Sequence, residues 1–314
     1  MDQTGRTHDP SDEASAQQAG LESDARSILD TAHEAFVSMD AGGFITDWNR
    51  QAEVTLGWTR DEAVGRVLAD TIIPERFRTD HWDGLQKFLE TGAGPVLGKR
   101  LELVAIHREG HEIPIEITIS ALHDGARHSF HAFLHDISAR KRNERYLAAQ
   151  HAVANALAEA DSVAEAAPKL LAALGESLGW ETGGWWEVDE DAQVLRCRDL
   201  WCAPDIDAAA FLELSRTTAF ERGVGLPGRV WASGEAASVA DVLQDSNFPR
   251  ADAAAKAGLH AAICLPVLRR DEVRGAIEFF TRESSHRPEE LVELMESLSN
   301  QIGRFFTVLE ERAA

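Results

Sequence analysis

The stretch FITDWNRQAE, residues 44–53, decides the fold of the first half of the chain. It follows a β-rich run, residues 35–40, and the turn-forming residues 41–43, so it predicts the second strand of a hairpin. Asn49 belongs to a residue type that caps helices, and Gly57 to one that ends them. The sequence therefore predicts a hairpin that runs directly into a short helix.

The residues that follow complete one module. Thr59 and Glu62 have the spacing of a capping box, which predicts a second short helix. Pro74 starts a longer helix that ends at Gly92. Its inward face is predicted to hold Phe77, Leu85, Phe88 and either His81 or Trp82. Alternating residues predict strands at 101–106, 112–122 and 129–137. Residues 25–137 should thus form a compact α+β domain.

A linker helix is predicted over residues 138–160, which contain neither Pro nor Gly. Its four- and three-residue steps are typical of a helical pairing seam, formed by Tyr146, Gln150, Val153, Leu157 and Ala160. We expect this seam, together with the last helix, to support a parallel homodimer. The basic stretch Arg140, Lys141, Arg142 and Arg145 is interpreted as a solvated helix face.

The second half predicts another antiparallel sheet flanked by helices. A helix is expected over 163–178, and strands are expected at 184–188, 194–201, 261–268 and 273–281. A C-terminal amphipathic helix is predicted over 288–313, and its apolar face is formed by Leu291, Leu294, Met295, Leu298, Ile302, Phe305, Phe306 and Leu309. The fold class is therefore α+β: two sheet modules, the second over 161–305, joined by a long linker helix.

Composition limits the function. The 314 residues carry a formal net charge of −22, which disfavours nucleic acid as a partner. Residues 1–24 are acidic and poor in large aliphatic residues, so they are predicted to be a disordered tail and not a secretory signal. No uncharged apolar stretch reaches the ~18 residues of a membrane span. We therefore expect a cytoplasmic protein with no membrane association and with reduced thiols at Cys197, Cys202 and Cys264.

Two sets of motifs carry a family resemblance. In the first half they are FITDWNRQAE (44–53), LGW (56–58), VGR (64–66), REG (108–110), PIE (114–116) and DISARK (136–141). Residues 25–137 thereby resemble a PAS domain of the S-box type. In the second half the motifs are GVGLPGRVW (223–231), NFPR (247–250), GL (258–259), PV (266–267) and GAIEFF (275–280). Residues 161–305 resemble a GAF domain.

The resemblance implies a sensory input region that binds a small ligand or a partner and relays the change through helical linkers. It implies an effector such as a histidine kinase or a nucleotide cyclase, in the same chain or in another. The sequence shows no kinase, cyclase or phosphodiesterase motif, so we predict no catalytic residue and no enzyme activity. The alternatives are the input half of a sensor histidine kinase in a two-component phosphorelay and a haem-based gas sensor. A third alternative makes the second domain a thiol-dependent reductase.

In the first domain, the resemblance points to His81, at the place where rhizobial oxygen sensors carry the haem ligand. The other candidates for lining a ligand cavity there are Leu85, Phe88, Ile117 and Phe133. An arginine that would contact bound oxygen is missing, since Leu101 stands near its place, so a colourless protein is predicted. Asp136 is expected to couple the last strand to the linker, as the corresponding acid does in the family.

In the second domain, Trp186, Trp201 and Trp231 are candidates for a ligand pocket, with core packing as the alternative. The first domain has no cysteine for flavin photochemistry, and no cysteine of the second is followed by His, so neither flavin nor covalently attached bilin is expected. The histidines of the first domain's strands and turns are His107, His111, His123, His128, His131 and His135. No pair of them has a convincing ligand spacing, so no metal site is predicted unless His81 binds haem.

Overall fold

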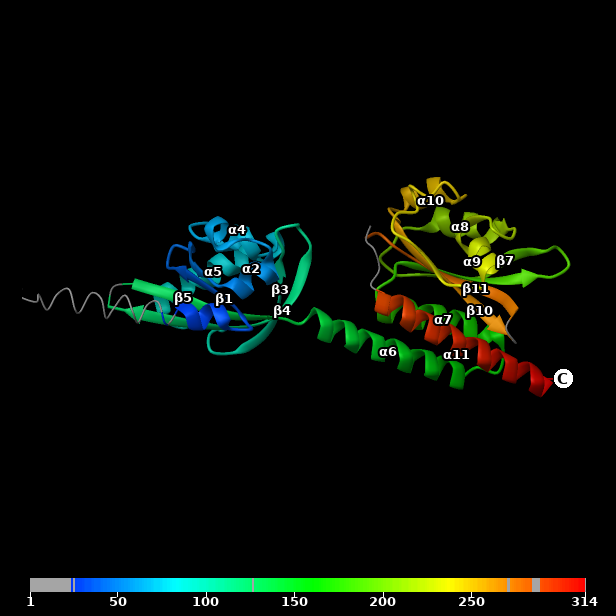
Figure 1. Cartoon of the computed structure of the whole chain (residues 1–314), viewed down its shortest axis with the longest axis horizontal. Helices are drawn as coiled ribbons and strands as arrows, with labels where there is room; N and C mark the ends of the chain where they lie inside the picture. Colours follow the sequence, from blue (N-terminus) through cyan, green and yellow to red (C-terminus); the bar gives the residue numbers. More distant parts are fainter. Residues whose placement is uncertain (1–23, 25, 126, 270–271, 284–288, 314) are drawn as a thin grey trace, which may run out of the picture. The chain divides into compact units, whose positions relative to one another are not determined.

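The computed structural model describes residues 24, 26–125, 127–269, 272–283 and 289–313, and the tail predicted over 1–24 lies outside them except for Asp24. The chain divides into two compact units, Met1–Arg142 and Asn143–Ala314 (Figure 1). Each unit has its own sheet and its own buried clusters, so each is described separately.

The first unit is an antiparallel sheet covered by helices on one face. The sheet has the order β2-β1-β5-β4-β3. Its strands are β1 (Ala35–Asp40), β2 (Ile45–Trp48), β3 (Arg100–Ile106), β4 (Glu112–Asp124) and β5 (Arg127–Asp136). Its helices are α2 (Arg50–Leu56), α3 (Arg60–Ala63), α4 (Leu68–Ile72) and α5 (Glu75–Thr91). Figure 1 shows α2, α4 and α5 gathered on the same side of the sheet. The antiparallel module is thus confirmed.

Asn49 connects three segments of this unit. Its Oδ1 accepts hydrogen bonds from the backbone N–H of Ala52 in α2 (2.9 Å) and of Phe36 in β1 (2.8 Å). Its Nδ2 donates to the carbonyls of Leu29 (2.8 Å) and Glu34 (3.0 Å). The side chain is buried, and these four hydrogen bonds of its two polar atoms replace the bonds to water that it has lost. The predicted cap is confirmed, and it also fixes the segment before β1.

The second unit is a six-stranded sheet with helices on both faces, in the order β8-β7-β6-β11-β10-β9. Its strands are β6 (Thr182–Asp189), β7 (Val194–Cys202), β8 (Ala219–Phe220), β9 (Ala237–Val239), β10 (Ala261–Arg269) and β11 (Glu272–Thr281). Its helices are α7 (Val163–Leu178), α8 (Ala209–Thr217), α9 (Gly225–Ser233), α10 (Ala251–Lys256) and α11 (Glu289–Ala313). The sequence had not predicted α8, α10, β8 and β9, nor α4 in the first unit.

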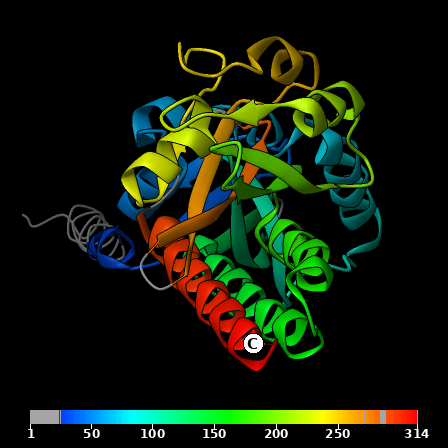
Figure 2. The ribbon, with the colours of Figure 1, turned by 90° about the vertical axis from the view of Figure 1, so that its right-hand side faces the viewer.

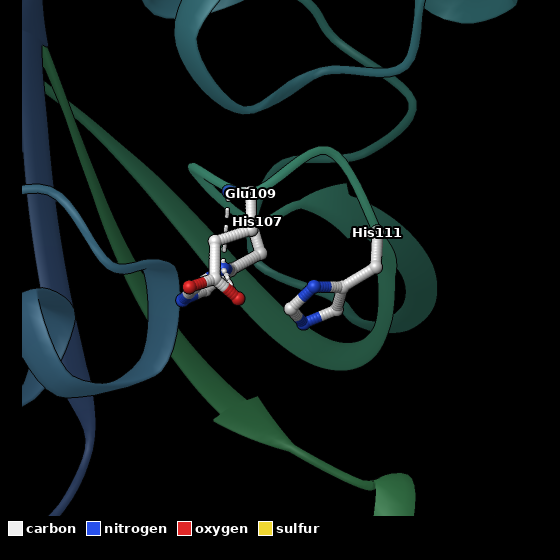
Figure 3. Close-up of side chains that lie close together, drawn as sticks. All are labelled: His107, Glu109 and His111. Carbon is white, nitrogen blue, oxygen red and sulfur yellow. Dashed lines mark hydrogen bonds and ion pairs between the residues drawn. The ribbon is translucent and has the colours of Figure 1, made fainter. Parts of the chain in front are cut away.

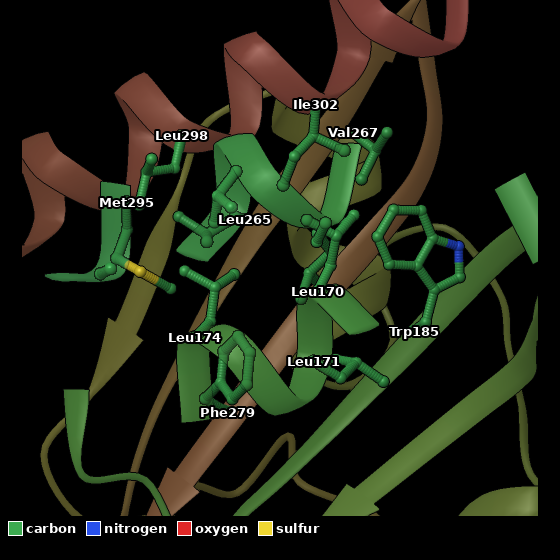
Figure 4. Packing of buried hydrophobic residues seen from close by; sticks show 14 of the residues in the cluster. Leu170, Leu171, Leu174, Trp185, Leu265, Val267, Phe279, Met295, Leu298 and Ile302 are labelled. Carbon is green, nitrogen blue, oxygen red and sulfur yellow. The ribbon is translucent and has the colours of Figure 1, made fainter. Parts of the chain in front are cut away.

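Helix α6 (Ser138–Ala158) begins in the first unit and ends in the second. In the second unit it lies beside α7 and α11 under one face of the sheet (Figure 2). Figure 4 shows how Leu170 and Leu174 of α7 meet Met295, Leu298 and Ile302 of α11 over Leu265 of β10. The other face carries a second buried cluster beneath α8, α9 and α10.

The apolar seam predicted on α6 is occupied within the chain. Val153, Leu157 and Ala160 are 0%, 5% and 6% exposed in the cluster with α7 and α11. The face of α11 from Leu291 to Phe306 is buried in the same cluster. These buried residues therefore do not support the expected pairing with a second copy, and the homodimer stays a prediction. The side chain of Leu309, which was predicted for the same face of α11, lies outside the described ones. The seam pattern marked an internal helix contact.

Gly303 sets how closely α11 approaches the sheet. A Cβ at this position would meet the backbone carbonyl oxygen of Leu268 in β10. Ser299, one turn earlier, donates its hydroxyl hydrogen to the carbonyl of Pro266. The glycine is therefore required by packing, even though alanine is the better helix former by about 1 kcal/mol.

We predict that Gly303→Ala lowers the stability of the second unit by about 1–3 kcal/mol, because α11 must move away from β10. Gly84 in α5 is the matched control, since nothing lies within 4 Å of a Cβ placed there. Gly84→Ala should leave the first unit unchanged or stabilise it by up to about 1 kcal/mol. Calorimetric unfolding of both full-length variants checks this, and equal effects at the two positions would contradict it.

Candidate functional site

His81 lies on α5, partly buried, with its Nδ1 shielded from solvent and without a hydrogen-bond partner. Its ring meets that of Trp82 edge-on, with the centroids 5.5 Å apart. Burial lowers the pKa of His81 because the charged imidazolium loses its hydration. The side chain is therefore a neutral imidazole at pH 7, the form that can ligate a metal.

The predicted lining residues do not all face this interior. Leu85 is buried with Met39 and Phe130, and Phe88 meets Phe130 edge-on at 5.2 Å. Ile117 is buried in the neighbouring cluster of the same sheet face. Phe133 was wrongly assigned to the lining. Since side chains alternate along β5, the inward positions are Phe130 and Leu134, and Phe133 is 40% exposed on the other face.

Phe77 was also wrongly assigned to the inward face of α5. It is 43% exposed, and the guanidinium of Arg76 lies 4.6 Å from its ring centroid. The apolar side chains near α5 pack on one another: Met39, Leu85 and Phe130 form one buried cluster with Phe88 and Leu97 against it. In this arrangement the residues do not fit a haem group, and a protein without visible absorption remains our prediction.

A second group of polar residues lies where the first sheet continues into α6. Oδ1 of Asp136 accepts a hydrogen bond from the backbone N–H of Ser138 at 2.7 Å. Glu102 on β3 pairs with Lys141 at 2.6 Å and with Arg140 at 3.0 Å. Hydrogen bonds from Lys141 and Arg140 lower the pKa of Glu102. We name Glu102, Arg140 and Lys141 the exit clamp. The basic residues interpreted as a solvated face thus include two that hold α6 to the sheet.

The three candidate tryptophans lie on different faces of the second sheet. Trp186 and Trp231 belong to the cluster beneath α8, α9 and α10. Trp201 packs against the opposite cluster, and its ring lies where a Cβ of Gly175 in α7 would be. The three tryptophans therefore cannot line one common ligand pocket. Trp231 alone lines an open hollow of about 610 Å³, together with Arg222, whose guanidinium lies 4.8 Å from the Trp231 ring centroid.

An ion pair that the sequence analysis missed lies at the centre of the α8–α10 face. Arg250 and Glu278 are each 1% exposed, and Nη1 and Nη2 of Arg250 donate to the two carboxylate oxygens of Glu278 at 2.7 Å. Nη1 also donates to Oγ of Ser215 at 2.8 Å. Aromatic rings surround the guanidinium at 4.9–5.4 Å, those of Trp186, Phe211, Phe220, Phe248 and Phe280.

This pair anchors three elements of the face to one another. Ser215 is on α8, Arg250 precedes α10 and Glu278 is on β11. Gly184 on β6 leaves room for it, because a Cβ there would come within 3.4 Å of Glu278 Oε1 and 3.2 Å of Trp186 Nε1. Nε of Arg250 and Nε1 of Trp186 are buried and lack a partner among the described protein atoms. Arg250 and Glu278 stand in the motifs NFPR and GAIEFF, but the sequence analysis assigned no role to either residue and did not predict that they pair.

We predict that Arg250→Met lowers the free energy of unfolding of the second unit by about 3–5 kcal/mol, because Glu278 is left charged and buried. The double variant Arg250→Met/Glu278→Leu removes both charges and should lose much less. Chemical unfolding of the full chain, followed by tryptophan fluorescence, compares the variants. Equal losses in the single and double variants would show that packing, and not charge, is what Arg250 supplies.

The cysteines bear on the reductase alternative. Burial, with the negative charge of Glu278 as the next cause, raises the pKa of Cys197 to about 11. Burial also raises the pKa values of Cys202 and of the fully buried Cys264. Thiol catalysis needs a thiolate near neutral pH, so these environments work against it.

We therefore expect Cys197 to be nearly inert. A thiol of pKa about 11 is about one-thousandth thiolate at pH 8. Titration of the native protein with a thiol-specific disulfide reagent should show slow reaction at Cys197 and Cys264, and full reaction of all cysteines only in denaturant. Fast labelling of Cys197 in the native protein at pH 8 would contradict its burial and raised pKa. It would favour the thiol-dependent reductase alternative.

Two family models match the chain. One, described as the PAS fold, matches residues 23–137, and the other, described as a GAF domain, matches residues 160–307. The order is the one that the sequence motifs predicted, so the resemblance is confirmed. No helix in the described part of the chain is long and apolar enough to cross a membrane.

Curated relatives match part of the chain. An uncharacterized protein of Azorhizobium caulinodans is 35% identical over 130 residues, 41% of this chain and 18% of that protein. Sensor protein FixL of Bradyrhizobium diazoefficiens is 25% identical over 40% of this chain and 25% of its own length. The cell-division control histidine kinase PdhS of Brucella ovis is 30% identical over 53% of this chain and 15% of its length. The chain thus spans a quarter or less of these relatives.

Among solved structures, the free methionine-R-sulfoxide reductase of Neisseria meningitidis is 18% identical, with a TM-score of 0.44, and the match covers 62% of this chain and 99% of that one.

Proposed function

The chain joins a PAS domain to a GAF domain, and on this premise we propose that it is a sensory signal-transduction protein whose PAS domain passes a change of state to the GAF domain through α6. The observation that supports this most directly is the continuity of α6. The helix is held to the PAS sheet by the exit clamp at its start, and one face of its later turns is buried in the GAF core. One continuous helix therefore has residues in both domains.

The proposed relay starts in the hairpin formed by β3 and β4. Glu102 is paired in register with Glu116, and Glu116 with His135 on β5, one residue before Asp136. A ligand or partner that moves β4 together with its hydrogen-bonded neighbours β3 and β5 would move Glu102 and Asp136 together. Both residues contact the first turn of α6, so the shift would change how that turn is held. The motion would then reach the buried residues Val153 and Leu157.

For the GAF domain we propose that a small ligand enters the hollow beside Trp231. The hollow is lined by charges of both signs, Arg222 and Arg274 with Glu190 and Glu272, beside the ring of Trp231, which suits a small polar molecule. The PAS ligand is proposed to be a small molecule other than haem, flavin or a covalently bound bilin. No catalytic step is proposed for these domains.

The effector is proposed to be a histidine kinase or a cyclase, in the same chain or in a partner. Support comes from the relatives, two of which are a sensor protein and a histidine kinase by name. A homodimer in the cytoplasm also remains a proposal. Among the described side chains of α6 and α11, the large apolar ones that are exposed are Leu147 and Val308, and we propose these as its contacts.

We predict that Glu102→Gln and Asp136→Ala each speed amide hydrogen exchange in the first turns of α6, because each removes a hydrogen bond that holds the helix to the sheet. If the bond contributes about 1 kcal/mol, exchange should rise about fivefold. The matched control is Glu112→Gln, since Glu112 pairs with Arg76 and not with α6. Exchange over 138–157 that is unchanged in both test variants, or equally raised in the control, would count against the relay.

A further inference from the structure

The turn between β3 and β4 brings three potential metal ligands together. His107, Glu109 and His111 lie within residues 107–111, between the end of β3 at Ile106 and the start of β4 at Glu112. One ligand atom from each lies within 4.8 Å of the others (Figure 3). No other such group of three occurs among the described residues. The sequence analysis predicted no metal site because it compared histidine pairs and left out the glutamate between them.

The backbone of the turn holds the two histidines face to face. The N–H of His107 donates to the carbonyl of His111 at 2.9 Å, and the N–H of Gly110 donates to the carbonyl of His107 at 2.8 Å. Gly110 has φ +89°, a conformation that favours glycine. The imidazole rings stack with their centroids 4.4 Å apart. The spacing is thus a property of the hairpin.

His107 is oriented by its neighbours. Its Nε2 edge faces Gly57, where a Cβ would collide with the ring. Its Nδ1 accepts a hydrogen bond from the N–H of Glu109 at 3.2 Å and lies 3.8 Å from Oε2 of Glu109. An accepting Nδ1 carries the lone pair, so the proton of the neutral ring is on Nε2. This is the tautomer that a metal bound at Nδ1 requires.

The cation next to these residues in the sequence, Arg108, is already paired. Arg108 pairs with Glu62 at 2.7 Å, and its guanidinium lies 5.3 Å from the ring centroid of Trp58. The carboxylate of Glu109 is 77% exposed and His111 is exposed, so both side chains are free to turn toward an ion.

We propose that His107, Glu109 and His111 bind one divalent transition-metal ion, with Zn²⁺ as the probe. Two imidazole nitrogens and one carboxylate oxygen are a ligand set that Zn²⁺ accepts in tetrahedral geometry, with water in the fourth position. Tetrahedral ligands lie about 3.4 Å apart, so the donors must close in from their present spacing. Nδ1 of His107 exchanges its backbone hydrogen bond for the metal. The bound ion would link the end of β3 to the start of β4. Glu102 of the exit clamp lies on the same strand β3.

The test is calorimetric titration of the full chain with Zn²⁺ at pH 7.5, in a buffer that does not bind zinc. One Zn²⁺ per chain should bind at this turn. His111→Ala and Glu109→Gln should each weaken binding at least about tenfold. These exposed residues are changed in preference to His107, which packs against Gly57. Circular dichroism verifies that the variants are folded.

The matched control is His123→Ala. His123 and His128 also stack, with centroids 4.3 Å apart, at the β4–β5 turn, but no third donor joins them among the described residues. Zinc binding that is unchanged in this variant, together with NMR shifts of the His107 and His111 imidazole signals on adding Zn²⁺, supports the proposal. The proposal is overturned if the wild type does not bind zinc, or if His111→Ala binds as tightly as the wild type.

Discussion

The burial of α6 in the GAF core is the constraint on which the rest of the arrangement depends. Ala149 and Val153 have no exposed surface, and they pack among residues of α7 and α11. The helix therefore cannot rotate in the second unit without repacking that core, which resists change because it is close-packed. The start of α6 can change its position more easily, because it is held there by the exposed ion pairs of the exit clamp. The stiff end and the adjustable end of one helix lie in different domains.

The two faces of the GAF sheet are specialised in a way that fits this constraint. The face toward α6, α7 and α11 is filled by aliphatic side chains and a few aromatic rings. The opposite face is built around Arg250 and Glu278, whose geometry is directional. Apolar contacts tolerate small slips, whereas a bidentate ion pair among rings accepts few arrangements. The GAF domain thus combines a helix layer that receives α6 with a face whose helices are held in one position.

The sequence predicted the elements that depend on neighbouring residues. It did not predict the contacts that depend on residues far apart in the chain. The cap at Asn49, the hairpins and the long helices follow from local patterns, and the structure confirms them. The seam on α6 was recognised, but no pattern tells whether such a stripe meets a second copy or its own chain. Phe133 was assigned to the wrong face because the register of β5 with its neighbouring strands decides which alternate residues point inward.

The candidate sites were harder to predict than the fold. His81 and Asp136 were found through the family resemblance, and Leu85 through the helical periodicity. His81 and Leu85 lie on α5, and Asp136 is the last residue of β5. Arg250 and Glu278 are 28 residues apart, and a buried charge pair leaves no periodic signal. The turn that carries His107 and His111 needed the hairpin register before its donors could be seen to meet.

Asn49 has a consequence for where the first domain ends. Its amide nitrogen is satisfied by the carbonyls of Leu29 and Glu34, both of which precede the first strand. Without those carbonyls the same amide would remain buried with unmet hydrogen-bond donors, at a cost of about 1–3 kcal/mol. The segment from Leu29 to Glu34 is therefore expected to fold and unfold together with the sheet. The limit of this domain is set by hydrogen-bond acceptors upstream of the sheet.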